Sequence, residues 1–275
     1  MGLACDALTL TDLTRAVELA IVKKAECCII AHHNLHSLYL CQQDTRMRQL
    51  YDQAHYIHAD GMSLILLGKL LGYPVGRKHR VTYLDWLDPL MMAACSRGWR
   101  MFYLGSRPQI AEKGSSILRD RFPGLCIEAA HGYFNPEPTS GENRTILKRI
   151  REFNPNVLMV GMGMPRQEHW LLDNLGDLST NAILLSGGMM DYVAGTVPSP
   201  PRWMGRIGLE WLFRLATEPR RLWRRYLLEP WALLACLLRR HPKSPLALAG
   251  KAESVSMVNV PEQVMFDHED RPSIV

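Results

Sequence analysis

Short apolar runs alternate with amphipathic stretches along the first 200 residues. Runs dominated by apolar residues and closed by polar residues or glycine predict buried strands. They lie at residues 27–31, 56–60, 100–104, 125–130, 156–160 and 181–186. Helical spacing predicts helices at residues 11–24, 62–71, 110–121 and 142–153, and two more begin after Thr82 and Pro165. Because strands and helices alternate, we predict an α/β fold, a Rossmann-like and mostly parallel sheet with helices on both faces.

The pattern changes between residues 202 and 240, where arginines repeat through a background of Trp, Leu and Phe. Nine Arg minus three Glu give this segment a net charge of +6, whereas the whole chain carries +5. Arg214, Arg221 and Arg225 follow one another at intervals of seven and four residues, so they share one face of a helix. The sequence therefore predicts a basic, amphipathic helical appendage.

The charge pattern of this appendage alone does not distinguish between two interpretations. A helical pair packed on the rest of the protein with its arginines in water explains it, and so does a helix lying on an anionic membrane. Four Trp favour the membrane, because Trp suits a boundary that is wet on one side and apolar on the other. Arg rather than Lys favours a phosphate ligand, which lipid, pyrophosphate and nucleic acid all offer.

Composition divides the 275 residues into three parts. Residues 1–200 form the α/β domain, and residues 201–241 form the basic amphipathic appendage, for which we favour a role in membrane association. Residues 242–275 form a polar, slightly acidic tail that we expect to be disordered. A hydrophobic fraction of 47% and a charged fraction of 21% are typical of a globular protein.

Cysteine usage and the N-terminal sequence indicate the compartment. Seven cysteines occur without a C-x-x-C pair, which favours buried thiols in a reducing environment. The first twenty residues lack the basic start and apolar run of an export signal, so we expect a cytoplasmic protein. The apolar run at residues 231–238 is too short to cross a bilayer, and Pro230 is expected to break the helix before it. Any membrane contact should therefore be peripheral.

Polar residues follow the first predicted strand, at the edge where an open parallel sheet places its ligands. They are His32, His33, Asn34 and His36. Three histidines raise the possibility of a metal site, but no carboxylate or cysteine accompanies them at a suitable spacing. Hydrogen bonding or a structural role is therefore favoured over metal binding.

Two further strand ends carry charged residues. Asp60 follows the second strand beside a predicted helix N-terminus, where it either caps the helix or takes a proton from a substrate hydroxyl. Arg80 and Thr82 place donors at the start of another helix, as an anion site requires. An exposed arginine beside a helix cap explains the same residues, so both roles stay open.

Glycine turns follow two of the strands. Gly105 begins one turn, and Gly161 and Gly163 form a G-x-G in the other. Such turns can bring backbone N–H groups and a helix N-terminus against a phosphate. Arg166 stands where G-x-G-x-x-G needs its third glycine, so the motif indicates a nucleotide-like ligand without identifying it.

Taken as a set, these residues resemble the WecG/TagA/CpsF glycosyltransferase family over residues 11–240. The G-M-G-M-P-R-Q-E sequence and the appendage sequences G-L-E-W, E-P-R-R and R-R-Y-L carry the resemblance most specifically. Residues 32–39 are most similar to the GumM-type glucosyltransferases of xanthan-like exopolysaccharide assembly. Other matching positions are Asn34, residues 58–61, residues 80–82, residues 132–134 and Asp191.

The resemblance implies an inverting enzyme that moves a hexose from a UDP-sugar onto a sugar carried by polyprenyl diphosphate, at the cytoplasmic face of the membrane. GumM-type similarity implies glucose from UDP-glucose and a β-1,4 linkage. N-acetylmannosamine or its uronic acid is the alternative donor group. The implied partners are the UDP-sugar, the lipid-linked acceptor and an anionic membrane surface, without nucleic acid, and a homo-oligomer is left open.

The resemblance also assigns roles to residues. Asp60 matches the family's base, and His32 occupies a position where the family often has Thr. Arg80, Gln167 and Asp191 are implied as pocket residues. Arg214, Arg221 and Arg224 are implied as appendage arginines that reach the pocket. The full set of candidate substrate-binding residues is His32, Asn34, Arg80, Thr82, Gly105, Gly161, Gly163, Gln167, Glu168 and Asp191.

Displacement at an anomeric carbon needs a base for the acceptor hydroxyl and positive charge for the leaving diphosphate. Many glycosyltransferases supply that charge with a metal held by an Asp-x-Asp pair, and no such pair stands at a predicted strand end here. Arginines and helix N-termini are the available cations. We therefore predict a reaction that needs no metal or other cofactor.

A protein of another class, a nucleotide- or RNA-binding regulator, also joins a Rossmann-like sheet to an Arg-rich helix. Two features disfavour it. Trp and Leu are interleaved with the arginines, and the acidic Asp60 and Asp191 at predicted strand tips repel a nucleic-acid backbone. The sequence therefore favours the enzyme.

Overall fold

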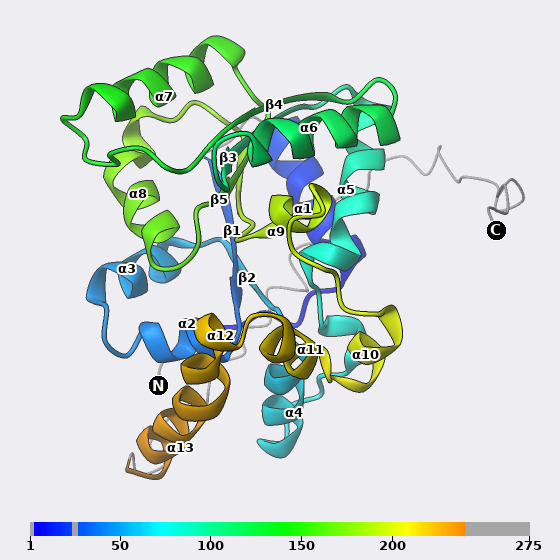
Figure 1. Cartoon of the computed structure of the whole chain (residues 1–275), viewed down its shortest axis with the longest axis vertical. Helices are drawn as coiled ribbons and strands as arrows, with labels where there is room; N and C mark the ends of the chain where they lie inside the picture. The colour runs from blue at the N-terminus through cyan, green and yellow to red at the C-terminus, as the bar shows by residue number, and fades with distance from the viewer. Residues whose placement is uncertain (1–2, 24–26, 240–275) are drawn as a thin grey trace, which may run out of the picture.

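A computed structural model describes residues 3–23 and 27–239 of the chain. Its centre is a six-stranded sheet in the order β2-β1-β6-β5-β3-β4, and every pair of neighbours is parallel (Figure 1). The predicted Rossmann-like α/β fold is confirmed, with strand ends shifted by one or two residues. The strands are β1 (Cys28–His33), β2 (Tyr56–Ala59), β3 (Arg100–Gly105), β4 (Cys126–Ala130), β5 (Val157–Gly161) and β6 (Ala182–Leu185).

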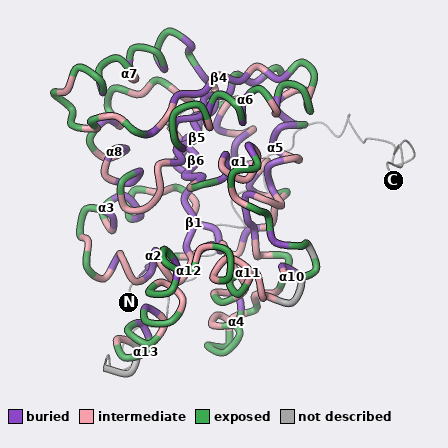
Figure 2. The backbone as a smooth tube through the Cα atoms, in the orientation of Figure 1, coloured by how far each residue is buried: buried purple, intermediate pink, exposed green. Residues whose placement is uncertain are grey.

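Helices cover both faces of the sheet, which is why the strands read as continuous apolar runs rather than as alternating ones. Trp86 of α5 is fully buried on one face and Trp170 of α8 on the other. The strands between these faces are mostly buried (Figure 2). One core includes α1 (Leu10–Lys23), α5 (Tyr83–Arg97), α6 (Ile110–Arg121) and α9 (Met189–Val193). The other includes α2 (Leu35–Leu40), α3 (Thr45–Gln53), α7 (Gly141–Phe153) and α8 (Arg166–Asn174).

The carboxyl ends of parallel strands meet at one edge of the sheet. The loops that leave this edge begin at Asn34 after β1, Asp60 after β2, Ser106 after β3, Met162 after β5 and Ser186 after β6. Residues far apart in the sequence are thereby brought to one place. Helix α4 (Met62–Leu70) and the 3₁₀ turn Arg77–His79 lie between β2 and α5.

The basic appendage folds as a series of short helices that pack back on the domain. His36 Nδ1 of α2 lies 2.7 Å from Glu229 Oε2 at the start of α13, and Leu233 of α13 is buried. The helices are α10 (Arg202–Ile207), α11 (Glu210–Thr217), α12 (Pro219–Trp223), the π-helix Arg224–Leu228 and α13 (Glu229–Arg239).

The prediction that Pro230 breaks a helix is wrong. Helical backbone runs without interruption over residues 219–239. The π-helix ends at Leu228, two residues before the proline, and the Glu229 N–H bonds to the carbonyl of Arg224, five residues back. This wider turn accommodates a ring that clashes with the preceding turn of an ordinary α-helix. The helical path is interrupted at Glu218 instead, between α11 and α12.

Within the described residues, no helix combines the length and the apolar composition that crossing a membrane requires. The tail at residues 242–275, for which we predicted disorder, lies outside the described residues.

Candidate active site

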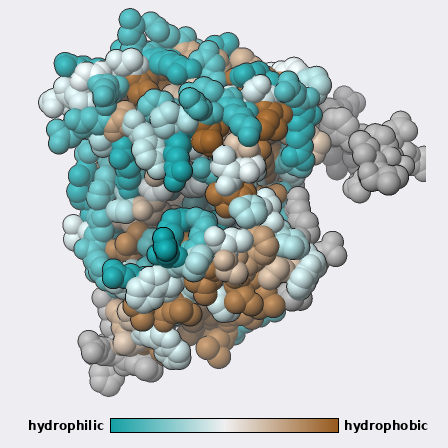
Figure 3. All heavy atoms as spheres, in the orientation of Figure 1, coloured by the Kyte–Doolittle hydropathy of each residue, from teal (hydrophilic) through white to brown (hydrophobic). Residues whose placement is uncertain are grey.

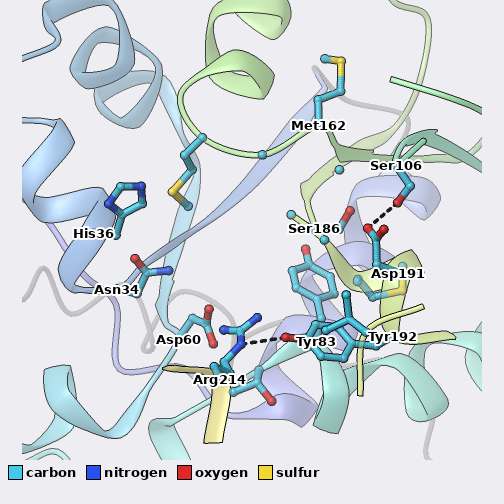
Figure 4. A pocket seen from close by; sticks show the side chains of 18 of the residues that line it. Asn34, His36, Asp60, Tyr83, Ser106, Met162, Ser186, Asp191, Tyr192 and Arg214 are labelled. Atoms are coloured by element: carbon cyan, nitrogen blue, oxygen red, sulfur yellow. Dashed lines mark hydrogen bonds between the residues drawn. The ribbon is translucent and has the colours of Figure 1, made fainter. Parts of the chain in front are cut away.

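A cavity of about 530 Å³ lies over the carboxyl edge of the sheet. Its walls come from the loops after all six strands of the sheet, from α5 and α9, and from the appendage. Figure 4 shows Asn34 and His36 on one side of it, Ser106 and Asp191 on another, and Asp60 beside Arg214. The predicted site residues that line it are His32, Asn34, Asp60, Thr82, Gly161, Gly163, Asp191, Arg214 and Arg221.

Asp60 directs its carboxylate to the cavity and does not cap α4. The N-cap of that helix is Gly61, which has a φ of 118° and makes no side-chain capping bond. The Asp60 backbone N–H donates to the His33 carbonyl at 2.8 Å, which fixes the turn at the end of β2. Its side chain retains 27% of its exposure, so a substrate hydroxyl can reach it. Of the two roles that the sequence left open, the geometry favours the base.

Arg80 lies beside the cavity and joins the domain to the appendage. Its Nη2 donates to Asp85 at 2.8 Å and its Nη1 donates to Glu210 of α11 at 2.9 Å. Thr82 donates to the same Asp85 carboxylate at 2.9 Å. Two carboxylates already neutralise Arg80, so this guanidinium holds α11 in place instead of lining the space for an anion.

Gly105 lies beneath the cavity and does not line it. A Cβ on Gly105 would meet the backbone of Gly161 on the adjacent strand, and one on Gly161 would meet the carbonyl of Gly187. These glycines let three strand ends approach closely. Gly163, with a φ of 83°, turns the chain into the following loop.

Gln167 and Glu168 are fully buried beneath that loop. Gln167 Oε1 accepts from the Gly163 N–H at 3.2 Å, and its Nε2 donates to Glu168 Oε1 at 2.9 Å. Burial raises the pKa of Glu168 to about 7. The two side chains therefore hold the glycine loop from below and do not line the cavity.

Five arginines line the cavity, three of them from the appendage, together with four carboxylates. Arg214 Nε donates to the Tyr192 hydroxyl at 2.7 Å. This bond holds the guanidinium beside the carboxylate of Asp60 (Figure 4). Arg221 forms two bonds of 2.6 Å with Glu218. Arg224 lies outside the cavity, exposed and stacked over a Trp ring. The lining arginines are Arg107, Arg166, Arg214, Arg221 and Arg225.

Asp191 reaches the cavity from the first turn of α9. Ser106 Oγ donates to its Oδ2 at 2.8 Å, and the Tyr103 hydroxyl lies 2.9 Å from that Oγ (Figure 4). The positive φ of Ser106, 55°, is uncommon for a residue other than glycine and belongs to the turn after β3. Nothing in the sequence marks Ser106 as a site residue except its place after Gly105.

Other lining residues also escaped the sequence prediction. Tyr83 and Tyr192 lie on helices whose apolar spacing indicates only core positions. Arg225 shares the helical spacing of Arg214 but was absent from the residues that the family resemblance assigned. The lining residues outside the predicted set include His36, Tyr83, Ser106, Arg107, Tyr192 and Arg225.

The three histidines near β1 diverge instead of converging on one point. His32 Nδ1 lies 2.9 Å from the Leu185 carbonyl, His33 Nδ1 lies 3.0 Å from Ser37 Oγ, and His36 pairs with Glu229. In the part of the chain that the structure describes, no three His, Cys, Asp or Glu side chains are grouped as metal ligands.

Comparison with known proteins identifies the family. Residues 1–245 match the model of the glycosyl transferase WecG/TagA/CpsF family. The chain belongs to this family. It is also similar to a protein of Staphylococcus aureus strain NCTC 8325 and to those of strains COL and MRSA252, at 27% identity over 71% of each chain. All three are named N-acetylglucosaminyldiphosphoundecaprenol N-acetyl-beta-D-mannosaminyltransferase.

Membership of the WecG/TagA/CpsF family makes the chain a glycosyltransferase and decides between the two classes of protein that the sequence left open. The names of these relatives specify an N-acetylmannosaminyl group, which was the alternative donor group, and not the glucosyl group implied by GumM-type similarity. In this glycosyltransferase the cavity therefore has to be judged as a site for a sugar donor and a sugar acceptor.

Proposed function

We propose that this glycosyltransferase moves an N-acetylmannosaminyl group from its UDP derivative onto a sugar carried by polyprenyl diphosphate. One observation carries the proposal: the carboxylate of Asp60 lies in the same cavity as five arginines, with Arg214 beside it. A transferase of this kind needs both a base and a counter-charge for a diphosphate. The names of the relatives support the donor group and the lipid-linked acceptor.

In the reaction, Asp60 accepts the proton of the acceptor hydroxyl as its oxygen attacks the anomeric carbon. The bond from that carbon to the diphosphate oxygen breaks, and its electron pair leaves with UDP. A single displacement of this kind inverts the configuration at the anomeric carbon. Arg214 and Arg225 neutralise the charge that grows on the leaving diphosphate, because guanidinium binds phosphate with parallel hydrogen bonds. Arg221 contributes only if the diphosphate replaces Glu218 as its partner.

Arginines in this position supply the charge that a metal ion supplies elsewhere, so we propose that transfer does not depend on a divalent cation. Turnover should persist in EDTA. Strong inhibition by EDTA that manganese or magnesium reverses would contradict this part of the proposal.

UDP-glucose is the second candidate donor, and His32 is the observation that favours it. His32 lines the cavity at the position where the resemblance places Thr in much of the family, so the sugar-binding surface of this chain is altered there. A change of side chain at this point bears directly on which donor sugar fits.

Competition between donors tests the proposal. UDP-N-acetylmannosamine, its uronate and UDP-glucose should be offered in turn, with a short-chain polyprenyl diphosphate N-acetylglucosamine as acceptor. We expect the highest kcat/KM with UDP-N-acetylmannosamine. A higher value with UDP-glucose would support the second candidate, and no transfer from any of the three would contradict the proposed function.

We place the reaction at the cytoplasmic face of the membrane, with the appendage on anionic lipid. Trp203, Trp211, Trp223 and Trp231 are all exposed, as expected of side chains that enter an interface. The appendage thus has two roles in this proposal, because its arginines also close the cavity.

A further inference from the structure

His32 turns one ring nitrogen toward the sheet and the other toward the cavity. Nδ1 lies 2.9 Å from the carbonyl oxygen of Leu185 in β6. A carbonyl oxygen only accepts, so Nδ1 carries the hydrogen, and Nε2 of the neutral ring carries a lone pair. Burial lowers the pKa of His32, against the opposing effect of Asp60. The ring is therefore a neutral base near pH 7.

A second acceptor faces this lone pair. Asp60 Oδ2 lies 3.8 Å from His32 Nε2, which is too far for a hydrogen bond between them. An O–H group, from water or from a substrate hydroxyl, can bridge two acceptors at this separation. Both residues line the cavity, where the acceptor hydroxyl would supply such a group.

We propose that His32 is a second catalytic base, which receives from Asp60, through a water molecule that bridges the two side chains, the proton that leaves the acceptor hydroxyl. This inference rests on the proposed transferase function. The hydroxyl O–H bond breaks while its oxygen bonds the anomeric carbon and UDP departs with the electron pair of the broken bond. The proton comes to rest on His32 Nε2 beside the restored Asp60 carboxylate, and it passes to water when the product leaves.

The groups packed around His32 do not compete for this proton. The His58 ring lies 5.7 Å and the Tyr83 ring 6.1 Å from the His32 ring, centroid to centroid. Burial lowers the pKa of His58 to about 3 and raises the pKa of Tyr83 well above its ordinary value. Burial also lowers the pKa of His33, on the opposite face of β1, to about 3.

Two arginines set the charge around the pair. Arg225 opposes a positive charge on His32, and Arg214 interacts with the Asp60 carboxylate. The carboxylate thus has positive charge on its appendage side and a neutral histidine on its sheet side. A bound diphosphate would offset the arginines, so the pair is best able to hold a proton when the donor is in place.

The test is the pH dependence of transfer by His32→Asn. Asn keeps an N–H for the Leu185 carbonyl but has no base at the position of Nε2. We expect kcat at pH 7 to fall about 10²-fold. The acidic limb of the kcat/KM profile should move to lower pH, because no second base shares the proton. His33→Asn, which alters the neighbouring buried histidine, should leave that limb in place.

We expect the same fall in kcat and the same shift of the acidic limb for His32→Thr. The proposal therefore remains testable if one of the two variants fails to fold. Circular dichroism and calorimetric binding of UDP show which variants are folded. An acidic limb at the wild-type pH in the folded variants overturns the proposal, because a structural histidine lowers the rate equally at all pH values. Absence of transfer by the wild-type chain counts against the proposed function instead, so the two failures are distinct.

Discussion

Asp60 shows how one residue boundary decides between two roles. A carboxylate just before a helix is ordinarily a cap, and the sequence placed Asp60 at that position. The structure begins α4 at Met62, as predicted, and its N-cap is Gly61, at a φ that only glycine adopts readily. The carboxylate is thereby released from the helix and turned toward the cavity. Hydrophobic periodicity predicted where the helix starts, but it does not show which of the residues before that start is the cap.

Glu168 yields a prediction about stability. Its pKa rises from an ordinary value of 4.5 to about 7 on folding, chiefly through burial. The folded state then binds the proton more tightly, so the stabilisation is fully present below pH 4.5 and is lost as the pH rises to about 7. This group should lower the free energy of unfolding by about 3 kcal/mol across that window.

Urea unfolding of Glu168→Gln at pH 4.5 and pH 7.5 checks this prediction. The neutral amide does not titrate, so the difference in unfolding free energy between wild type and variant should change by about 3 kcal/mol between the two pH values. Glu152→Gln alters an exposed carboxylate of α7 and serves as the control. A wild-type to Glu168→Gln difference that is the same at both pH values would contradict the assignment.

The sequence identified the types of site residue better than their exact positions. Gln167 and Glu168 belong to the most specific motif, yet they support the glycine loop from below instead of lining the cavity. A sequence motif indicates that its residues belong to a functional loop. It does not indicate which of them face the cavity and which support the loop from below. Ser106 could not be found at all, because its role depends on Asp191, which is 85 positions away.

At the scale of elements, the strands were the most predictable part of the chain. A fully covered parallel sheet gives continuous apolar runs, and each predicted run became a strand. Helices α2 and α3 were missed because they are short, and their start depends on the side chains of Asn34 and Asp44 as caps. The prediction that Pro230 breaks the helix was wrong because a π-helix, which has no recognisable sequence signature, accommodates the proline.

The appendage offers adjacent arginines as a matched pair for mutation. Arg225 lines the cavity, whereas Arg224 is exposed outside it. Arg225→Ala should lower kcat about 10²- to 10³-fold, as loss of a charge that stabilises the transition state does elsewhere. Arg224→Ala should stay near the wild-type rate. Steady-state transfer with both variants, checked for folding by circular dichroism, measures the contrast, and equal losses would contradict the geometry.

At the scale of the whole molecule, many exposed apolar side chains gather around α4 and the appendage. In Figure 3 hydrophobic residues cover the lower part of the molecule, where α4 and α11 lie. Leu66 and Leu70 of α4 are 59% and 84% exposed, and the appendage adds Trp211 and Leu212. The basic Lys69, Arg77 and Lys78 accompany α4. The membrane-facing surface that we propose thus includes α4 as well as the appendage.

Liposome binding tests this surface. Full burial of an aliphatic side chain contributes about 1.5 to 3 kcal/mol, so Leu66→Ser with Leu70→Ser should weaken sedimentation with anionic vesicles at least about tenfold. Val22→Ser with Met92→Ser, which alters exposed apolar residues of α1 and α5, is the control. The wild-type interaction should also weaken at high salt. Equal binding by the two double variants would exclude α4 from the membrane surface.

The most direct measurement is transfer from UDP-N-acetylmannosamine to short-chain polyprenyl diphosphate N-acetylglucosamine by the wild type and by Asp60→Asn. The variant retains the shape of the side chain and removes the base. We expect a disaccharide lipid product from the wild type, a kcat about 10²- to 10⁴-fold lower in Asp60→Asn, and UDP binding that is unchanged between them. A variant that turns over at the wild-type rate would contradict the central claim that Asp60 is the base of this transferase.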